Sequence, residues 1–181
     1  MFAPALTARA AALIARYASL GMKIATAESC TGGLVAGLLT EIPGSSAVLE
    51  RGFVTYSNDA KRELLGVPAA TLEAHGAVSE ATARAMAQGA LAHSHAQVAV
   101  SVTGVAGPDG GSAEKPVGLV HFACAGPGAA IVAIERRFGD LGRSEIRTAS
   151  VEQALELLER AALSLGVPHR PAAVPFDETP F

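Results

Sequence analysis

The spacing of apolar and polar residues divides the chain into alternating helical and extended segments. Residues 6–20 are Ala-rich, with leucines and a tyrosine near helical spacing, and Gly21 follows as a typical helix stop. Short apolar runs predict buried strands at 22–27 and 98–103, and residues 49–56 predict a further strand. The segments between them predict helices at 31–40, 57–65 and 80–93, with one further helical turn at 71–75.

The C-terminal part of the pattern is different. Residues 117–125 and 129–138 predict two strands joined by a Gly-Pro-Gly turn, which is typical of an antiparallel hairpin. Residues 141–165 predict a long amphipathic helix. Residues 168–181 hold four prolines and few core residues, so we expect a tail or a partner-binding arm there.

Strands separated by helices, followed by a hairpin, predict an α/β fold with three layers. We expect a mixed β-sheet that is covered by helices on both faces. The sequence contains no internal repeat, so the prediction is one domain over residues 1–167, with the Pro-rich tail at 168–181.

Composition narrows the classes of function. The 181 residues are 50% hydrophobic and 17% charged, with a net charge of -3, which gives no electrostatic case for binding nucleic acid. Cys30 and Cys124 lack the spacing of a metal site, and reduced thiols fit a cytosolic protein. No apolar run approaches the roughly 20 residues of a membrane span, and no signal peptide is recognisable. We expect a cytoplasmic protein without membrane contact.

The first chemically interesting stretch is residues 26–33, Thr-Ala-Glu-Ser-Cys-Thr-Gly-Gly, where a strand gives way to a helix. Free N–H groups and the dipole at a helix start suit an anion or a developing oxyanion, and the two glycines permit close approach. Alternatively, Ser29 or Thr31 is an ordinary helix N-cap. Cys30 is a rival nucleophile, and only one of Ser29 and Cys30 can face a cleft because neighbouring side chains alternate.

A serine nucleophile needs a base. No G-x-S-x-G elbow occurs, and no histidine lies in a loop that is obviously built around Ser29, although His75 stays open. Tyr56 and Lys61 lie on a second strand–helix junction. If the two strands are neighbours, Ser29 and Tyr56 face one crevice, which Lys61 reaches from the first helical turn. The alternative is a tyrosine at the core edge and a solvated lysine.

Two further features can bind a ligand. The Gly-rich loop at 104–116 follows a buried strand, although such a loop can equally be a surface crossing. Arg143 and Arg147 are one helical turn apart, so both can grip one phosphate or carboxylate, or they are simply an exposed pair.

Several of these motifs together resemble the CinA C-terminal domain family. They are Ala-Glu-Ser-Cys-Thr-Gly-Gly, Pro-Gly-Ser-Ser, Arg-Gly-Phe-Val-Thr-Tyr-Ser-Asn-x-x-Lys, His-Gly-Ala-Val-Ser, Gly-x-Ala-Gly-Pro-Asp-Gly-Gly and Lys-Pro-Val-Gly, between about residues 25 and 147. Characterised members are nicotinamide-nucleotide amidohydrolases. The resemblance implies hydrolysis of nicotinamide mononucleotide to nicotinate mononucleotide and ammonia, without a metal or organic cofactor. Larger relatives carry an N-terminal pyrophosphatase domain, which this chain is not expected to have.

The resemblance implies catalytic roles for Ser29, Tyr56 and Lys61, in an arrangement similar to that of serine β-lactamases. We expect Tyr56, supported by Lys61, to take the proton from Ser29. Residues 139–143 depart from the family's Gly-Asp-Arg, so Arg143 is assigned less directly. The expected substrate-binding residues are Cys30, Thr31, Gly32, Gly33, Ser45, Ser46, Asn58, Thr103, Gly104, Gly107, Arg143 and Arg147.

Among these, the serines, the loop from residue 107 and the arginines are candidates for the phosphate, with the arginines contributed by the same subunit or by a second one. Asn58 and Thr103 are candidates for the carboxamide or ribose. Two other functions stay open: a non-catalytic nucleotide-binding regulatory module, and an amidase for another small amide. A homodimer or higher homo-oligomer is expected from the apolar helices.

Overall fold

The computed structural model describes residues 2–128 and 130–165. One sheet contains the strands β1 (Ile24–Glu28), β2 (Leu49–Val54), β3 (Val98–Gly104), β4 (Leu119–Ala125) and β5 (Val132–Arg137). The α-helices are α1 (Pro4–Ser19), α2 (Leu34–Thr40), α3 (Asn58–Leu65), α4 (Ala69–His75), α5 (Glu80–Ala92) and α6 (Arg143–Leu165), and a 3-10 turn spans Ser45–Ala47. The predicted tail lies outside the described residues.

The sheet has the strand order β2-β1-β3-β4-β5. β1 runs parallel to both β2 and β3, whereas β4 and β5 are antiparallel to their neighbours. The predicted hairpin and the mixed sheet are therefore confirmed. The carboxyl ends of β1, β2 and β3 meet at one edge, which is where open α/β sheets form clefts.

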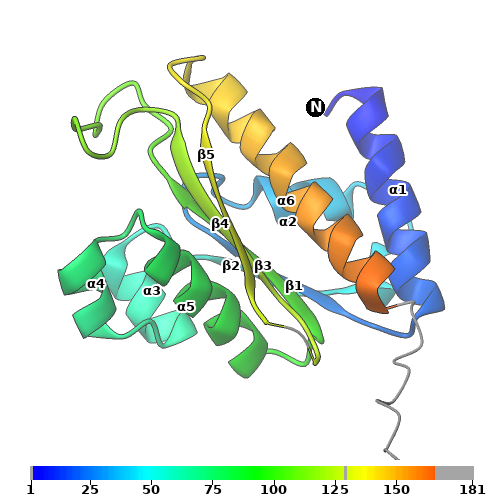
Figure 1. The fold of residues 1–181 in the computed structure, drawn as a ribbon. Helices are drawn as coiled ribbons and strands as arrows, with labels where there is room; N and C mark the ends of the chain where they lie inside the picture. The colour runs from blue at the N-terminus through cyan, green and yellow to red at the C-terminus, as the bar shows by residue number, and fades with distance from the viewer. Residues whose placement is uncertain (1, 129, 166–181) are drawn as a thin grey trace, which may run out of the picture.

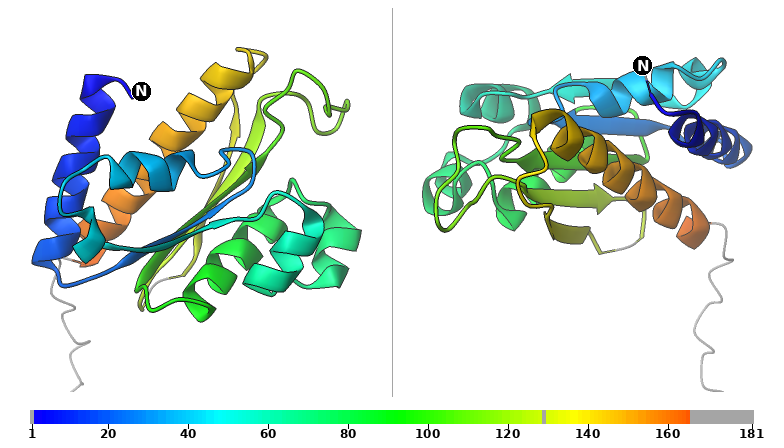
Figure 2. Two further views of the ribbon diagram at one scale, coloured as in Figure 1. Left: turned by 180° about the vertical axis from the view of Figure 1, so that it is seen from behind. Right: turned by 90° about the horizontal axis from the view of Figure 1, so that it is seen from above.

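Helices cover the sheet on both faces, as predicted (Figure 1). Figure 2 shows α1, α2 and α6 on one face, while α3, α4 and α5 lie on the other. The larger core joins α1, α2 and α6 to the sheet through side chains such as Leu38, Phe122 and Leu155. A second core contains Leu65 of α3 and Met86 of α5. Apolar burial on both faces is what fixes the three layers.

Local sequence explains why α3 and α5 begin where they do. The hydroxyl of Ser57 accepts a hydrogen bond from the N–H of Ala60 at 3.0 Å, and Ser79 caps α5 in the same way. The two helices approach closely at Gly89, where a Cβ would overlap the carbonyl of Leu65. This close packing sets α3, with its lysine, against α5.

Several boundaries differ from expectation by a few residues, and two of these shifts are at the starts of helices near the site. The second helix begins at Leu34 rather than at residue 31, because residues 31–33 form a turn with Gly32 and Gly33 at positive φ. The last helix begins at Arg143 rather than at 141. No helix among the described residues combines the length and apolarity that a membrane span requires.

Candidate active site

Ser29 leaves the sheet immediately after β1. Its N–H donates to the carbonyl of Val102 at 2.9 Å, which ties the start of the turn to the neighbouring strand β3. Side chains alternate between the two faces along this segment. Ala27 and Ser29 therefore lie on the α3/α5 side, whereas Glu28 and Cys30 lie on the α2/α6 side.

Lys61 reaches Ser29 from the second turn of α3. Its side chain is fully buried, at 1% exposure, and Nζ lies 3.0 Å from Ser29 Oγ. Nζ also donates to the carbonyl oxygens of Thr55 at 2.8 Å and Tyr56 at 3.5 Å. The alternative interpretation, in which Lys61 is a solvated surface lysine, is therefore wrong, because its amine is enclosed by the ends of β1 and β2.

The surroundings of Lys61 favour an uncharged amine. Burial lowers the pKa of Lys61, and no carboxylate among the described residues forms an ion pair with it. A neutral amine has two hydrogens and one lone pair. In that form the carbonyls of Thr55 and Tyr56 can take both hydrogens, which would leave the lone pair facing the hydroxyl of Ser29.

Tyr56 lies at the rim and not inside this group. Its side chain is 64% exposed, and its hydroxyl accepts a hydrogen bond from Nη2 of Arg143 at 3.3 Å. Nη1 of Arg143 donates to the carbonyl of Gly107 at 2.7 Å. The phenol is therefore bound to a guanidinium instead of to Lys61, which differs from the expected Tyr–Lys proton relay.

These groups border one cavity of about 290 Å³. The loop after β3 supplies Gly104, Gly107 and Asp109, and the turn before α5 supplies Ala77. Thr103 also lines it, with a hydroxyl that donates to the carbonyl of Ala77 at 2.7 Å. Ser29, Cys30, Tyr56, Lys61 and Arg143 complete the wall that the sequence predicted in part.

The free N–H groups at the start of α2 are bound by a side chain of the protein itself. The carboxylate of Glu28 accepts the N–H groups of Gly33, Val35 and Ala36 at 2.9, 3.0 and 2.9 Å, and the hydroxyl of Thr26 at 3.1 Å. The expectation that these helix amides are free for an anion is wrong, and so is the Ser or Thr N-cap. Sequence reasoning missed Glu28; its signal was a carboxylate placed in an otherwise apolar strand.

Arg147 holds the other side of the same turn. Its Nε and Nη2 donate to the carbonyls of Cys30 and Thr31 at 3.1 and 2.9 Å. The guanidinium thus fixes the backbone beside Ser29, and it does not line the cavity. Although Arg143 and Arg147 share a helix face, they contact different partners.

Cys30 is enclosed in the larger core. Its side chain is 6% exposed, and burial raises the pKa of the thiol to about 12. A thiol in this environment is a weak nucleophile because the thiolate is strongly disfavoured. Of the two neighbouring candidates, the structure therefore favours Ser29.

The remaining predicted residues lie elsewhere. Ser45 and Ser46 precede β2, at the end of the strand opposite to Tyr56. Asn58 begins α3 on its outer side, and Thr31 is fully buried, with a hydroxyl that has no partner among the described residues. His75 ends α4 and does not border the cavity.

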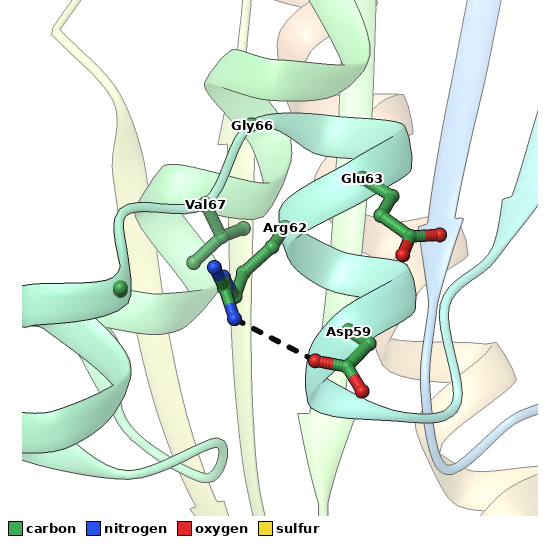
Figure 3. Close-up of a pocket in the computed structure, with 6 residues that line it drawn as sticks. Asp59, Arg62, Glu63, Gly66 and Val67 are labelled. Carbon is green, nitrogen blue, oxygen red and sulfur yellow. Dashed lines mark ion pairs between the residues drawn. The ribbon is translucent and has the colours of Figure 1, made fainter.

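A second hollow, of about 380 Å³, lies on the outer surface of α3 (Figure 3). Asp59 and Arg62 form an ion pair at 3.6 Å within it, and Glu63, Gly66 and Val67 are the other lining residues that the figure labels. Its charged side chains are exposed and it contains no nucleophile. The chemistry of the described residues is therefore concentrated in the cavity beside Ser29.

Fold and cavity define a three-layer α/β protein with a buried serine–lysine pair at the carboxyl edge of its sheet. Residues 6–162 match the model of the CinA C-terminal domain. The chain belongs to the CinA C-terminal domain family.

Individual relatives agree with this. The crystal structure of the competence/damage inducible protein CihA from Agrobacterium tumefaciens superposes with a TM-score of 0.87, at 54% identity, over 92% of this chain and 99% of that one. A CinA-like protein of Anaeromyxobacter dehalogenans is 51% identical over 82% of this chain, which spans 36% of that protein's length. A nicotinamide-nucleotide amidohydrolase, PncC of Enterobacter agglomerans, is 58% identical over 65% of this chain and 72% of that protein.

Proposed function

We propose that the protein is an amidohydrolase that deamidates nicotinamide mononucleotide to nicotinate mononucleotide and ammonia. The observation that carries the proposal is the 3.0 Å contact between the enclosed amine of Lys61 and the hydroxyl of Ser29 in a cavity. Similarity to an amidohydrolase named for nicotinamide nucleotides supports this choice of substrate.

In the proposed first step, the neutral amine of Lys61 removes the proton from Ser29 as Oγ attacks the carboxamide carbon. General base catalysis of this kind contributes typically ~10²–10⁴-fold to a rate. Lys61, now an ammonium, returns the proton to the leaving nitrogen, and ammonia departs from an acyl-enzyme. Water then attacks the ester with Lys61 again as the base, which frees Ser29 and the carboxylate product.

The tetrahedral intermediate needs a donor for its oxyanion. Within the turn, the N–H groups of Ser29, Gly32 and Gly33 are bound to protein oxygens. The N–H of Cys30 has no acceptor among the described residues, and Cys30 borders the cavity. We assign the oxyanion contact to this N–H; removal of one such donor typically costs about 3 kcal/mol.

Tyr56 and Arg143 form the rim in this proposal and contact the substrate. An exposed phenol ring offers a face for a planar pyridine ring. The guanidinium of Arg143 lines the cavity, and we assign it to the phosphate. A direct role of Tyr56 as the base would require its hydroxyl to leave Arg143 first.

The test is ammonia release from nicotinamide mononucleotide, from the corresponding riboside and from free nicotinamide. We expect the phosphorylated compound to be the preferred substrate. Equal rates for all three would indicate an amidase for another small amide, whereas binding without turnover would indicate a regulatory module.

A further inference from the structure

The rim of the cavity beside Ser29 carries two opposite charges. Asp109 and Arg143 both line it, and neither belongs to an ion pair within residues 2–128 and 130–165. Arg143 donates only to the neutral oxygens of Gly107 and Tyr56. The carboxylate of Asp109 is thus free to meet a charge on a ligand.

The loop that carries Asp109 is held in place on both sides. Arg143 donates to the carbonyl of Gly107 at 2.7 Å, and Nζ of Lys115 donates to the carbonyl of His75 at 2.6 Å. The N–H of Ser112 donates to the carbonyl of Lys115 at 2.9 Å. The amine of Lys115 is thus directed to α4, and Lys115 does not line the cavity.

The inner end of the cavity adds no fixed positive charge, because the buried amine of Lys61 acts as a neutral base in the proposed mechanism. A ligand that fills the cavity therefore meets one anion and one cation at the rim. A pyridinium nucleotide matches this pattern, since its ring is cationic and its phosphate is anionic. Reduction of the ring by a hydride removes the positive charge but keeps the carboxamide, ribose and phosphate.

We infer that Asp109 makes this site selective for a carboxamide on a cationic ring, so that the oxidised nucleotide is bound in preference to its dihydro form, in which the ring is uncharged. This inference rests on the proposed function and adds a determinant of specificity to it. A carboxylate near the ring nitrogen stabilises the cationic ring of the oxidised form and contributes nothing to binding the uncharged ring of the dihydro form.

The test compares the binding of nicotinamide mononucleotide and of its dihydro form to Ser29→Ala, in which neither ligand is turned over. Adding Asp109→Asn keeps the shape of the side chain and removes its charge. We expect the oxidised ligand to bind about fivefold more weakly, as the loss of a partly exposed ion pair predicts, and the dihydro form to bind as before. Glu114→Gln, on the same loop but outside the cavity lining, is the matched control and should change neither.

Equal weakening of both ligands would assign Asp109 a role in loop structure and overturn the inference, as would no change in either. The proposed function is tested separately by turnover in the wild-type protein. If the wild type releases no ammonia but Asp109→Asn still removes a preference for the oxidised ring, the function fails and the inference stands. If ammonia is released but the preference does not depend on Asp109, the inference alone fails.

Discussion

Replacing Lys61 tests the proposed chemistry most sharply. Lys61→Met keeps an unbranched side chain of similar length and removes the amine that lies 3.0 Å from Ser29 Oγ. Loss of a general base lowers turnover by about 10²–10⁴-fold, so we expect a decrease of about 10³-fold in kcat. Lys61→Arg should be equally inactive although it keeps a long side chain with N–H donors, because a guanidinium cannot act as a base at accessible pH.

The pH dependence follows from the same residue. Burial lowers the pKa of Lys61 below its usual 10.5, and the active form is the neutral amine, so kcat/KM should rise with pH through this lowered pKa. The folded pKa is below the unfolded one, so the unfolded chain binds more protons between the two values. The free energy of unfolding should therefore rise with pH across that window, and this contribution should be absent in Lys61→Met.

The assay is chromatographic measurement of the nucleotide product across a range of pH. Circular dichroism and urea unfolding of each variant control for folding. Activity of Lys61→Met within about tenfold of the wild type, or an active Lys61→Arg, would refute Lys61 as the base.

Two further substitutions separate roles at the site. Glu28→Gln removes the charge that accepts three N–H groups at the start of α2. We expect the free energy of unfolding in urea to fall by about 2 kcal/mol, since hydrogen bonds to charged groups contribute ~1.5–3 kcal/mol. An unchanged urea midpoint would show that Glu28 does not hold the turn. Tyr56→Phe removes only a hydroxyl bound to Arg143, so KM should rise by a few fold while kcat stays within about threefold of the wild type. A loss of kcat of about 10²-fold or more would instead support a proton relay through Tyr56 and Lys61.

The meeting of Ser29, Tyr56 and Lys61 at one cavity was predictable from sequence. Each follows a short apolar strand, and the carboxyl ends of neighbouring parallel strands share an edge. The pattern of apolar residues likewise predicted the order of helices and strands, because central strands buried on both faces read as short continuous apolar runs, whereas helices buried on one face show a period of 3.6.

The details that decide the chemistry depend on contacts between distant segments. Nothing near Tyr56 in sequence indicates that its hydroxyl binds Arg143, which is 87 positions away. The spacing of Arg143 and Arg147 places them on one helix face, but only the packing of α6 shows that Arg147 binds the turn carbonyls. Glu28 caps α2 only because Gly32 and Gly33 at positive φ fold the helix start back over the strand end.

The central claim is that Ser29 is the nucleophile of an amidohydrolase. Its most direct test is ammonia release from nicotinamide mononucleotide by the wild type, Ser29→Ala and Cys30→Ala, each checked for folding. The account predicts activity in the wild type, retained activity in Cys30→Ala and none in Ser29→Ala. Activity that survives in Ser29→Ala but disappears in Cys30→Ala would contradict it and move the nucleophile by one residue.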